Sequence, residues 1–189
     1  DIKNNKLKRS SHTGIKYSML IVKDLNNDHR PEIISGGFSA SGNIPDTSQY
    51  RYHDQSCWLT VFDDELKPLF DPIEFKGRFT QVVTQPYQTA DKSYIAALHE
   101  QPGQYGGEKS LFLIDLKGNV LKKRALPSGN ATSQLSILTE HIEHSDQLWL
   151  IDRIQTKFLL LSNDLDTIEV KTLPQEMILE EQHDMEGDQ

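Results

Sequence analysis

The stretch SMLIVKDLNNDHRPEIISGG, residues 18–37, has two apolar, β-branched runs separated by a polar segment. Two other stretches have the same design: TQVVTQPYQTADKSYIAALH at 80–99 and QLSILTEHIEHSDQLWLIDR at 134–153. Such runs, bounded by polar turn residues and without a helical period, are typical of β-strands. We therefore expect three β-hairpins, each with a polar turn of about eight residues.

A second pattern follows each hairpin: WLTVFDDELKPLFDPIEF at 58–75, LFLIDLKGNVLKKRALP at 111–127 and FLLLSNDLDTIEVKTLP at 158–174. In each, a polar residue ends a strand and a tight turn follows. The strand-ending residues are Asp63, Asp115 and Ser162, and the turns contain Leu66, Gly118 and Leu165. Each unit is thus predicted to contain four short strands.

Repeats of about 45–60 residues with four strands each are typical of β-propeller blades. We predict an all-β fold with blades at 16–79, 80–130 and 131–176, between a disordered basic lead-in (1–15) and an acidic tail (177–189). A closed propeller typically has four or more blades. Three blades would be part of a larger propeller, half of a ring completed by a second copy, or an open stack, and a chain that begins at Asp1 favours the first. The alternative fold is an antiparallel β-sandwich.

Composition narrows the classes of partner. The chain has 189 residues and a net charge of -8, and nucleic-acid binding needs a clustered basic surface, so we expect no nucleic-acid partner. No apolar run reaches the length of a transmembrane helix, so no membrane insertion is expected. The single cysteine, Cys57, excludes an internal disulfide and is predicted to be a buried strand residue.

Oxygen-bearing residues recur at alternate positions between the first two strands. Asp24, Asn26, Asp28, the carbonyl of Arg30 and Glu32 occupy positions 1, 3, 5, 7 and 9 of a loop. Calcium takes about six to eight oxygen ligands from carboxylates, amides and carbonyls, whereas magnesium requires a stricter geometry. The pattern therefore predicts a Ca²⁺ site. The alternative is an Asx turn whose side chains bond the loop backbone without a metal.

The loop is not an EF-hand, because a strand rather than a helix follows it. It resembles the FG-GAP repeat, the blade of integrin α-subunit propellers and of many bacterial surface proteins. There, a D-x-[DN]-x-D-G-x-x-[DE] loop between the first two strands of a blade holds calcium. Residues 24–32 match this pattern except at His29, which replaces the usual glycine. The resemblance implies a calcium-stabilised module located outside the cytoplasm, in the periplasm, at the cell surface or secreted.

The equivalent segments of the other two units, QPYQTADKS (85–93) and TEHIEHSDQ (139–147), do not keep the donor pattern. We therefore expect the metal site in the first unit only. His141 and His144 flank Ile142 and Glu143 in a predicted turn, without the helical spacing of zinc proteases, and are interpreted as solvated turn residues.

Two long insertions, 38–56 and 99–109, join the second and third strands of their units. In a propeller they would share the face opposite the calcium loop. Exposed aromatic residues with arginine are typical of recognition surfaces. We expect these insertions to bind a protein or carbohydrate ligand. The alternative is that they are spacer loops without a function of their own. The candidate ligand-binding residues are Tyr50, Arg51, Tyr52, His53 and Tyr105.

No phosphate loop, dinucleotide fingerprint or nucleophile elbow occurs in the sequence. The expected function is that of a calcium-stabilised recognition, sensor or adhesion module. One alternative is a propeller-fold hydrolase or lyase, which a cleft uniting two of four residues would favour: His53, Asp54, His99 and Glu100. Another is a structural spacer in a larger protein.

Overall fold

The computed structural model describes residue 15 and residues 17–39, 52–77, 79–101, 107–127 and 135–172, which form strands and turns. No helix that could cross a membrane occurs among them. The strands are β1 (Tyr17–Lys23), β2 (Glu32–Gly37), β3 (Cys57–Phe62), β4 (Ile73–Phe75), β5 (Gln81–Gln88), β6 (Ser93–Glu100), β7 (Lys109–Asp115), β8 (Val120–Leu126), β9 (Leu135–Ile142), β10 (Ser145–Asp152), β11 (Lys157–Leu161) and β12 (Thr167–Thr172).

The strands form three four-stranded antiparallel sheets, each a meander in chain order: β1–β4, β5–β8 and β9–β12. We call them the first, middle and third sheets. The all-β class is confirmed, and the described strands form three sheets rather than the two of a sandwich. One sheet lies in each of the predicted units 16–79, 80–130 and 131–176, and no sheet closes on itself among the described residues.

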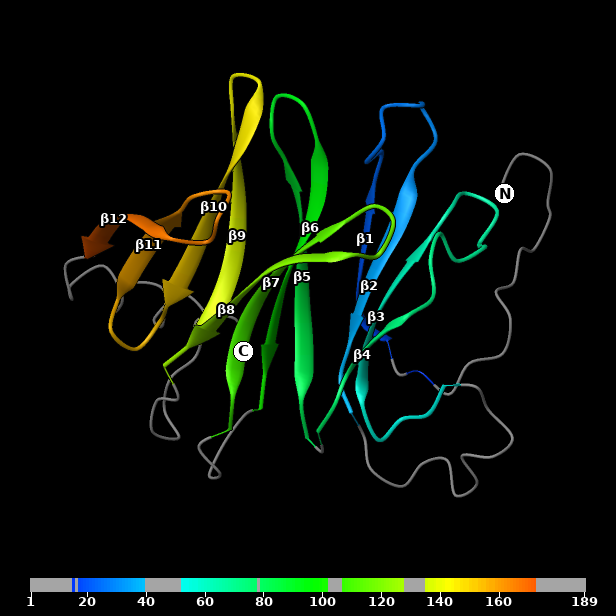
Figure 1. Ribbon diagram of the computed structural model, residues 1–189, viewed down its shortest axis with the longest axis horizontal. Helices are drawn as coiled ribbons and strands as arrows, with labels where there is room; N and C mark the ends of the chain where they lie inside the picture. The colour runs from blue at the N-terminus through cyan, green and yellow to red at the C-terminus, as the bar shows by residue number, and fades with distance from the viewer. Residues whose placement is uncertain are drawn as a thin grey trace, which may run out of the picture.

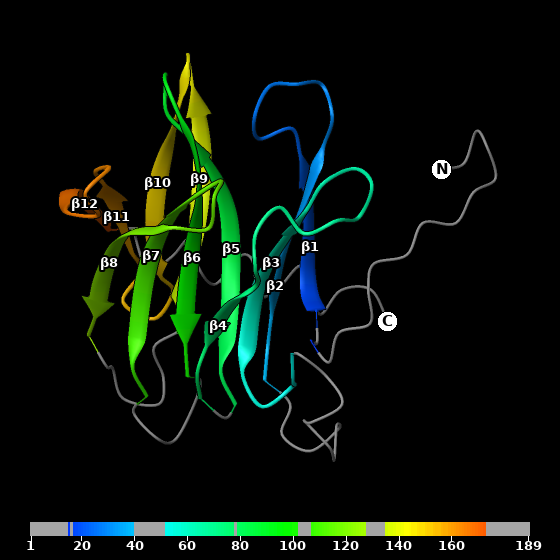
Figure 2. The ribbon, with the colours of Figure 1, turned by 45° about the vertical axis from the view of Figure 1, so that its right-hand side comes forward.

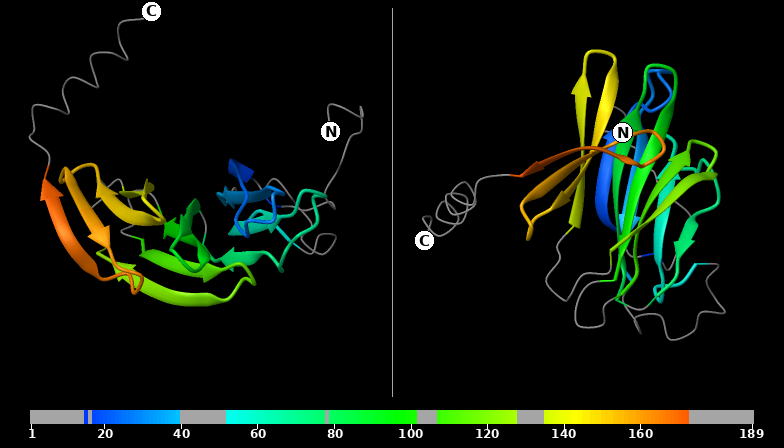
Figure 3. Two further views of the ribbon diagram at one scale, coloured as in Figure 1. Left: turned by 90° about the horizontal axis from the view of Figure 1, so that it is seen from above. Right: turned by 60° about the vertical axis from the view of Figure 1, so that its left-hand side comes forward.

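The sheets stand face to face with the middle one between the other two (Figures 1 and 2). Seen from above, they fan out along an arc (Figure 3). The first strands, β1, β5 and β9, lie on its concave side, and the fourth strands, β4, β8 and β12, lie on its convex side. The hairpin tips β1–β2, β5–β6 and β9–β10 all point to the same end of the molecule (Figure 1).

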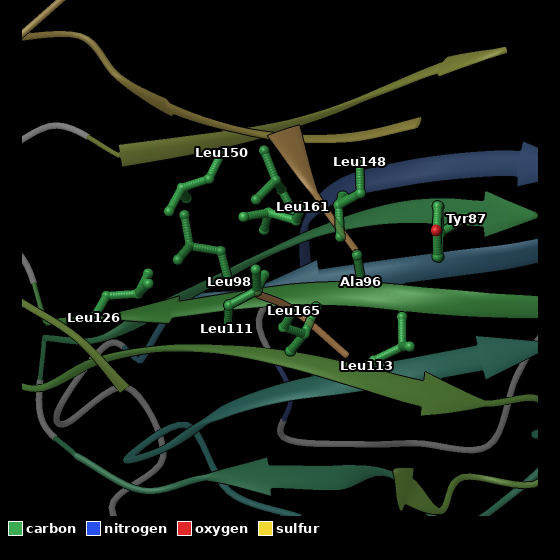
Figure 4. Packing of buried hydrophobic residues seen from close by; sticks show 11 residues of the cluster. Tyr87, Ala96, Leu98, Leu111, Leu113, Leu126, Leu148, Leu150, Leu161 and Leu165 are labelled. Carbon is green, nitrogen blue, oxygen red and sulfur yellow. The ribbon is translucent and has the colours of Figure 1, made fainter. Parts of the chain in front are cut away.

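The hydrophobic core has two parts, one on each face of the middle sheet. The first lies between the first and middle sheets and includes Ile34, Leu59, Val61, Val82, Ile95 and Ile114. The second lies between the middle and third sheets and includes Leu98, Leu111, Leu113, Ile137, Leu148 and Leu150 (Figure 4). Because strand side chains alternate between faces, β6 supplies Ile95 to one part and Leu98 to the other.

The first and middle sheets approach each other closely at Gly36. A Cβ atom at this position would lie 2.3 Å from the carbonyl oxygen of Val82. Nearby, the N–H of Ser39 donates to the carbonyl of Thr80 at 2.8 Å, and the N–H of Thr80 donates to Ser39 Oγ at 2.8 Å. The two sheets are therefore in backbone contact at this point, in addition to their side-chain packing.

The turns between the third and fourth strands are alike in all three sheets. In each, one side-chain oxygen of the strand-ending residue accepts two backbone N–H groups of the turn; these residues are Asp63, Asp115 and Ser162. Three residues later φ is positive: 63° at Leu66, 82° at Gly118 and 66° at Leu165. The predicted repetition of this turn is confirmed.

The turns of the three first hairpins differ from one another. They comprise residues 24–31, 89–92 and 143–144, because β5 continues to Gln88 and β9 to Ile142 before turning. The expectation of an eight-residue turn is correct for the first hairpin and wrong for the other two. There, polar residues that suggested a turn continue the strand ladder instead, at partly buried positions in β5 and at mostly exposed positions in β9.

The third hairpin is also shifted by one residue relative to the sequence alignment. Ile21 of β1 and Ile137 of β9 occupy aligned positions, and both pack toward the middle sheet. Since the first and third sheets cover opposite faces of the middle one, the two side chains point in opposite directions around the arc. A shift of one residue exchanges the two faces of a strand, which an alignment of apolar runs does not detect.

Cys57 is buried on β3, as the sequence predicts. Burial raises the pKa of its thiol to about 11, although a hydrogen bond from the Thr80 hydroxyl opposes this rise. The thiol is therefore protonated at neutral pH and serves as a packing residue.

We predict that Gly36→Ala lowers the free energy of unfolding by about 1–3 kcal/mol, the usual cost of overpacking, because its Cβ meets the backbone oxygen of Val82. Urea unfolding would measure this loss. Thr84→Ser, which removes the nearest side-chain methyl at 3.5 Å, should not rescue it. Full rescue would mean that the clash is with a side chain and would contradict the backbone contact.

Candidate metal centre

The loop of residues 24–31 connects Lys23, the last residue of β1, to Glu32, the first residue of β2. The backbone takes a left-handed conformation twice, with φ of 60° at Asn27 and 66° at His29. For a residue with a Cβ this conformation costs about 1–2 kcal/mol, and asparagine visits it more readily than most residues. His29 thus holds a conformation that glycine adopts without steric cost.

Three side chains of the loop accept hydrogen bonds from its backbone. Asp24 accepts from the N–H groups of His29 (2.9 Å) and Asp28 (3.2 Å). Asn26 Oδ1 accepts from the Asp28 N–H at 2.9 Å, and Asp28 Oδ1 accepts from the Arg30 N–H at 2.8 Å. The bonds accepted by Asn26 and Asp28 are Asx-turn bonds, and those accepted by Asp24 reach across the loop; together they hold the three side chains over the loop.

The amide group of Asn26 joins two carboxylates. Its Nδ2 donates to Asp28 Oδ2 at 3.1 Å and to Glu32 Oε1 at 3.2 Å. A weak partial positive charge therefore lies between two carboxylate groups. A cation at this point would interact with both carboxylates more strongly than the neutral amide does, because an interaction between two full charges is stronger than one between a charge and a neutral group.

Glu32 anchors the loop to the core. It is only 3% exposed, and its Oε2 accepts the N–H of Leu25 at 2.7 Å; the Leu25 side chain is itself part of the core. Burial raises the pKa of Glu32, the negative charges of Asp28 and Asp24 raise it further, and the Leu25 hydrogen bond opposes the rise. The loop thus brings three carboxyl groups close together, one of which is buried.

The side-chain donors Asp24, Asn26, Asp28 and Glu32 form one hydrogen-bonded network, and all are oxygen donors of the kind that calcium prefers. Among the described residues, no group of three or more His, Cys, Asp or Glu side chains is already arranged to hold a metal ion. Binding would therefore require the carboxylates to close around the ion, with Asn26 presenting its oxygen in place of its nitrogen.

The fifth predicted donor, the Arg30 carbonyl, is not part of this network in the described contacts. The structure instead places the Arg30 N–H on Asp28, and its guanidinium Nη1 lies 4.0 Å from Asp64 Oδ1. Arg30 is largely exposed and Asp64 is about one-third exposed, and an ion pair at this distance near the surface contributes little to stability.

A small polar pocket of about 190 Å³ lies beside the loop. One wall is Leu25, Asn26 and Asn27, and the other comprises residues 88–93, which are the β5–β6 turn and its flanking strand residues, together with Leu116. This turn brings Asp91 and Lys92 close to the candidate metal loop. The sequence could not indicate their proximity, because it depends on how the first two sheets pack.

Two of the predicted ligand-binding residues lie on the outer face of the first sheet. Tyr52 and His53 contact the Trp58 ring edge to face, with centroid separations of 5.2 and 5.7 Å. Trp58 Nε1 donates to the His53 carbonyl at 2.7 Å, and His53 Nε2 lies 3.8 Å from Glu74 Oε1. Tyr50, Arg51 and Tyr105 lie outside the described residues, so the recognition surface stays a prediction.

Three of the residues named for a possible catalytic cleft lie on different sheet faces. His53 is on the outer face of the first sheet, against Trp58. His99 packs on Phe75 between the first and middle sheets, where burial, followed by the charge of Lys123, lowers its pKa. Glu100, on the opposite face of β6, pairs with the buried Lys109 at 3.8 Å. These three side chains do not converge on one cleft.

His141 is a strand residue rather than a turn residue, because β9 extends to Ile142. Its Nδ1 lies 2.8 Å from Asp146 Oδ1, and Asp146 Oδ2 accepts the N–H of Gln88 at 2.7 Å. The same carboxylate lies 3.7 Å from Lys23 Nζ. Asp146 thus links all three sheets at the concave side of the arc, and His144 alone of the two histidines lies in the turn.

Comparisons with protein-family models, with curated proteins and with solved structures find no match to this chain.

We predict that Glu32→Gln makes stability in calcium-free buffer less dependent on pH. Because the folded-state pKa of Glu32 is raised above 4.5, its stabilising contribution is fully present below pH 4.5 and is lost as the pH rises through the folded value. Relative to wild type, the variant should therefore gain free energy of unfolding between pH 4.5 and pH 7. Urea titrations across this range measure the difference. An equal gain in Glu169→Gln, which alters an exposed carboxyl group of β12, would contradict this explanation.

Proposed function

We propose that this chain is a segment of a calcium-stabilised β-propeller of the FG-GAP type, which acts as a non-enzymatic recognition, sensor or adhesion module outside the cytoplasm. The observation that carries the proposal is the loop of residues 24–32, where a buried Glu32 and the carboxylates of Asp24 and Asp28 gather around the Asn26 amide.

The propeller part of the proposal is supported by the arrangement of the sheets. Each is a four-stranded antiparallel meander, and the three fan out with their first strands on the concave side (Figure 3). Blades of a propeller surround a central channel in the same way, with the faces of neighbouring sheets packed together. The repeated turn at Asp63, Asp115 and Ser162 supports descent of the three sheets from one structural unit.

Calcium would have a structural role in this proposal. When bound, it would neutralise the excess negative charge around Glu32 and hold the β1–β2 loop against the core residue Leu25. An affinity in the range of about 10⁻⁴–10⁻³ M is sufficient where calcium is abundant, as in extracellular modules. The proposed location outside the cytoplasm rests on the resemblance to the FG-GAP repeat and on the proposed calcium site alone.

Recognition would take place at the other end of the sheets. Strand β2 runs from the calcium loop to the start of the 38–56 insertion, so the two lie at opposite ends of the first sheet (Figure 1). Tyr52 and His53 lie on the outer face of that sheet at the end of this insertion, and aromatic side chains are effective anchors for protein or carbohydrate ligands.

The proposal predicts that millimolar calcium raises the thermal unfolding midpoint of the chelator-treated protein. A ligand that binds only the folded state stabilises it by about 2.7 kcal/mol when present at a hundredfold excess over its Kd. Asp28→Asn should abolish most of this shift, since it removes one charge and keeps an oxygen acceptor for the Arg30 N–H. Differential scanning calorimetry with and without calcium measures both effects.

The matched control is Asp115→Asn, which changes a turn carboxylate of the middle sheet and should leave the calcium shift intact. Magnesium at the same concentration should produce a smaller shift, because it is less tolerant of an irregular oxygen shell. Equal shifts with both ions, or an undiminished calcium shift in Asp28→Asn, would reject a specific site in this loop.

A further inference from the structure

The two interfaces between neighbouring sheets are built by the same rule. We call the face of a sheet toward the next sheet along the chain its front, and the opposite face its back. At the first interface the front of the first sheet, with Ile34 and Val61, packs on Val82 at the back of the middle sheet. At the second interface the front of the middle sheet, with Leu98, packs on Ile137 at the back of the third.

Two faces are left at the ends of the arc: the back of the first sheet and the front of the third (Figure 3). On each of these two faces, the first strand of the sheet, β1 or β9, carries exposed apolar side chains. At the back of the first sheet, Leu20 and Val22 are each 64% exposed. At the front of the third sheet, Leu138 is 46% exposed and Ile142 is 41% exposed.

The corresponding first-strand positions are buried or partly buried at the interfaces inside the chain. On back faces, Val82 of β5 is 1% exposed and Ile137 of β9 is 4% exposed. On the front face of β5, Tyr87 is also buried. The exposed residues at the ends of the arc are thus of the type that another sheet of the same kind covers elsewhere in the molecule.

On both end faces, a tryptophan farther from the concave side is already covered by neighbouring side chains of the same chain. At the back of the first sheet, Trp58 lies under Tyr52 and His53. At the front of the third sheet, Lys171 Nζ lies 4.8 Å from the ring centroid of Trp149, whose Nε1 donates to Glu140. The exposed apolar side chains named above belong to β1 and β9, the strands nearest the concave side, whereas Ile168 and Val170 are exposed on β12 at the convex side.

We propose that a second copy of this chain covers both end faces. The front of the third sheet of each copy would pack on the back of the first sheet of the other, so Leu138 of one copy would meet Leu20 and Val22 of its partner. This inference rests on the proposed propeller arrangement. Two copies of three sheets would close a ring of six sheets, within the range of about four to eight blades that propellers have.

The ring would continue the front-to-back rule of the two internal interfaces without a new kind of contact. A front-to-back contact joins two different surfaces, and such contacts give either closed rings or open filaments. With two copies related by a two-fold axis along the channel, both end faces of each copy are used and no apolar face is left for further addition.

The test is sedimentation velocity of the chain and of variants that alter one end face each. The wild type should sediment as a dimer, and Val22→Glu and Leu138→Glu should each sediment as monomers, because either substitution places a charge in both interfaces of the ring. Val120→Glu is the matched control: Val120 is also exposed but lies on β8 of the middle sheet, so the dimer should persist. Circular dichroism and thermal unfolding establish that each variant is folded.

Mixing the two monomeric variants makes the test specific for front-to-back pairing. In a mixed pair, the unaltered front of Val22→Glu meets the unaltered back of Leu138→Glu, while both substitutions fall in the other interface. The mixture should therefore form a 1:1 dimer that neither variant forms alone. Its affinity should be lower than that of the wild type, because only one interface is intact.

Several results would overturn the inference. A wild type that stays monomeric at all concentrations would mean that something other than a second copy, such as further sheets, covers the end faces. Loss of the dimer in only one variant would indicate pairing of like faces. No dimer in the mixture would mean that the two end faces do not pair front to back, and a continuous series of larger species would indicate filaments. The calcium-dependent shift in midpoint can be measured in the monomeric variants, so failure here is separable from failure of the calcium proposal.

Discussion

The middle sheet is apolar on both faces, and the rest of the structure depends on covering both. Its strand β6 alternates between Ile95, which packs against the first sheet, and Leu98, which packs against the third. Both side chains are fully buried, and each such burial contributes about 1.5–3 kcal/mol. A sheet of this kind is not stable alone, which explains why the chain has four-stranded units on either side of it.

The candidate metal loop is tied to this packing through Leu25. Its side chain is in the core between the first and middle sheets, and its N–H is held by the buried carboxylate of Glu32. The charge that gathers at Glu32 is therefore next to the interface between sheets. A cation bound there would stabilise the loop and, through Leu25, the contact of the first sheet with the middle one.

The sequence predicts those features that depend on local residue types. The three four-stranded units and the turns after Asp63, Asp115 and Ser162 follow from apolar runs and turn chemistry. The short β5–β6 and β9–β10 turns and the one-residue shift at Ile137 do not, because polar strand residues resemble turn residues and face assignment depends on sheet packing. Likewise, the loop donors could be named in advance, but the burial of Glu32 could not.

Isothermal titration of calcium into the chelator-treated chain tests the central claim most directly, because it counts ions as well as measuring affinity. The account predicts one calcium ion per chain, with a Kd of about 10⁻⁴–10⁻³ M, and proton release on binding that grows as the pH falls, because the pKa of Glu32 is raised and calcium binds its ionised form. No binding heat, or several weak ions per chain without proton release, would contradict it and leave residues 24–32 as a hydrogen-bonded turn.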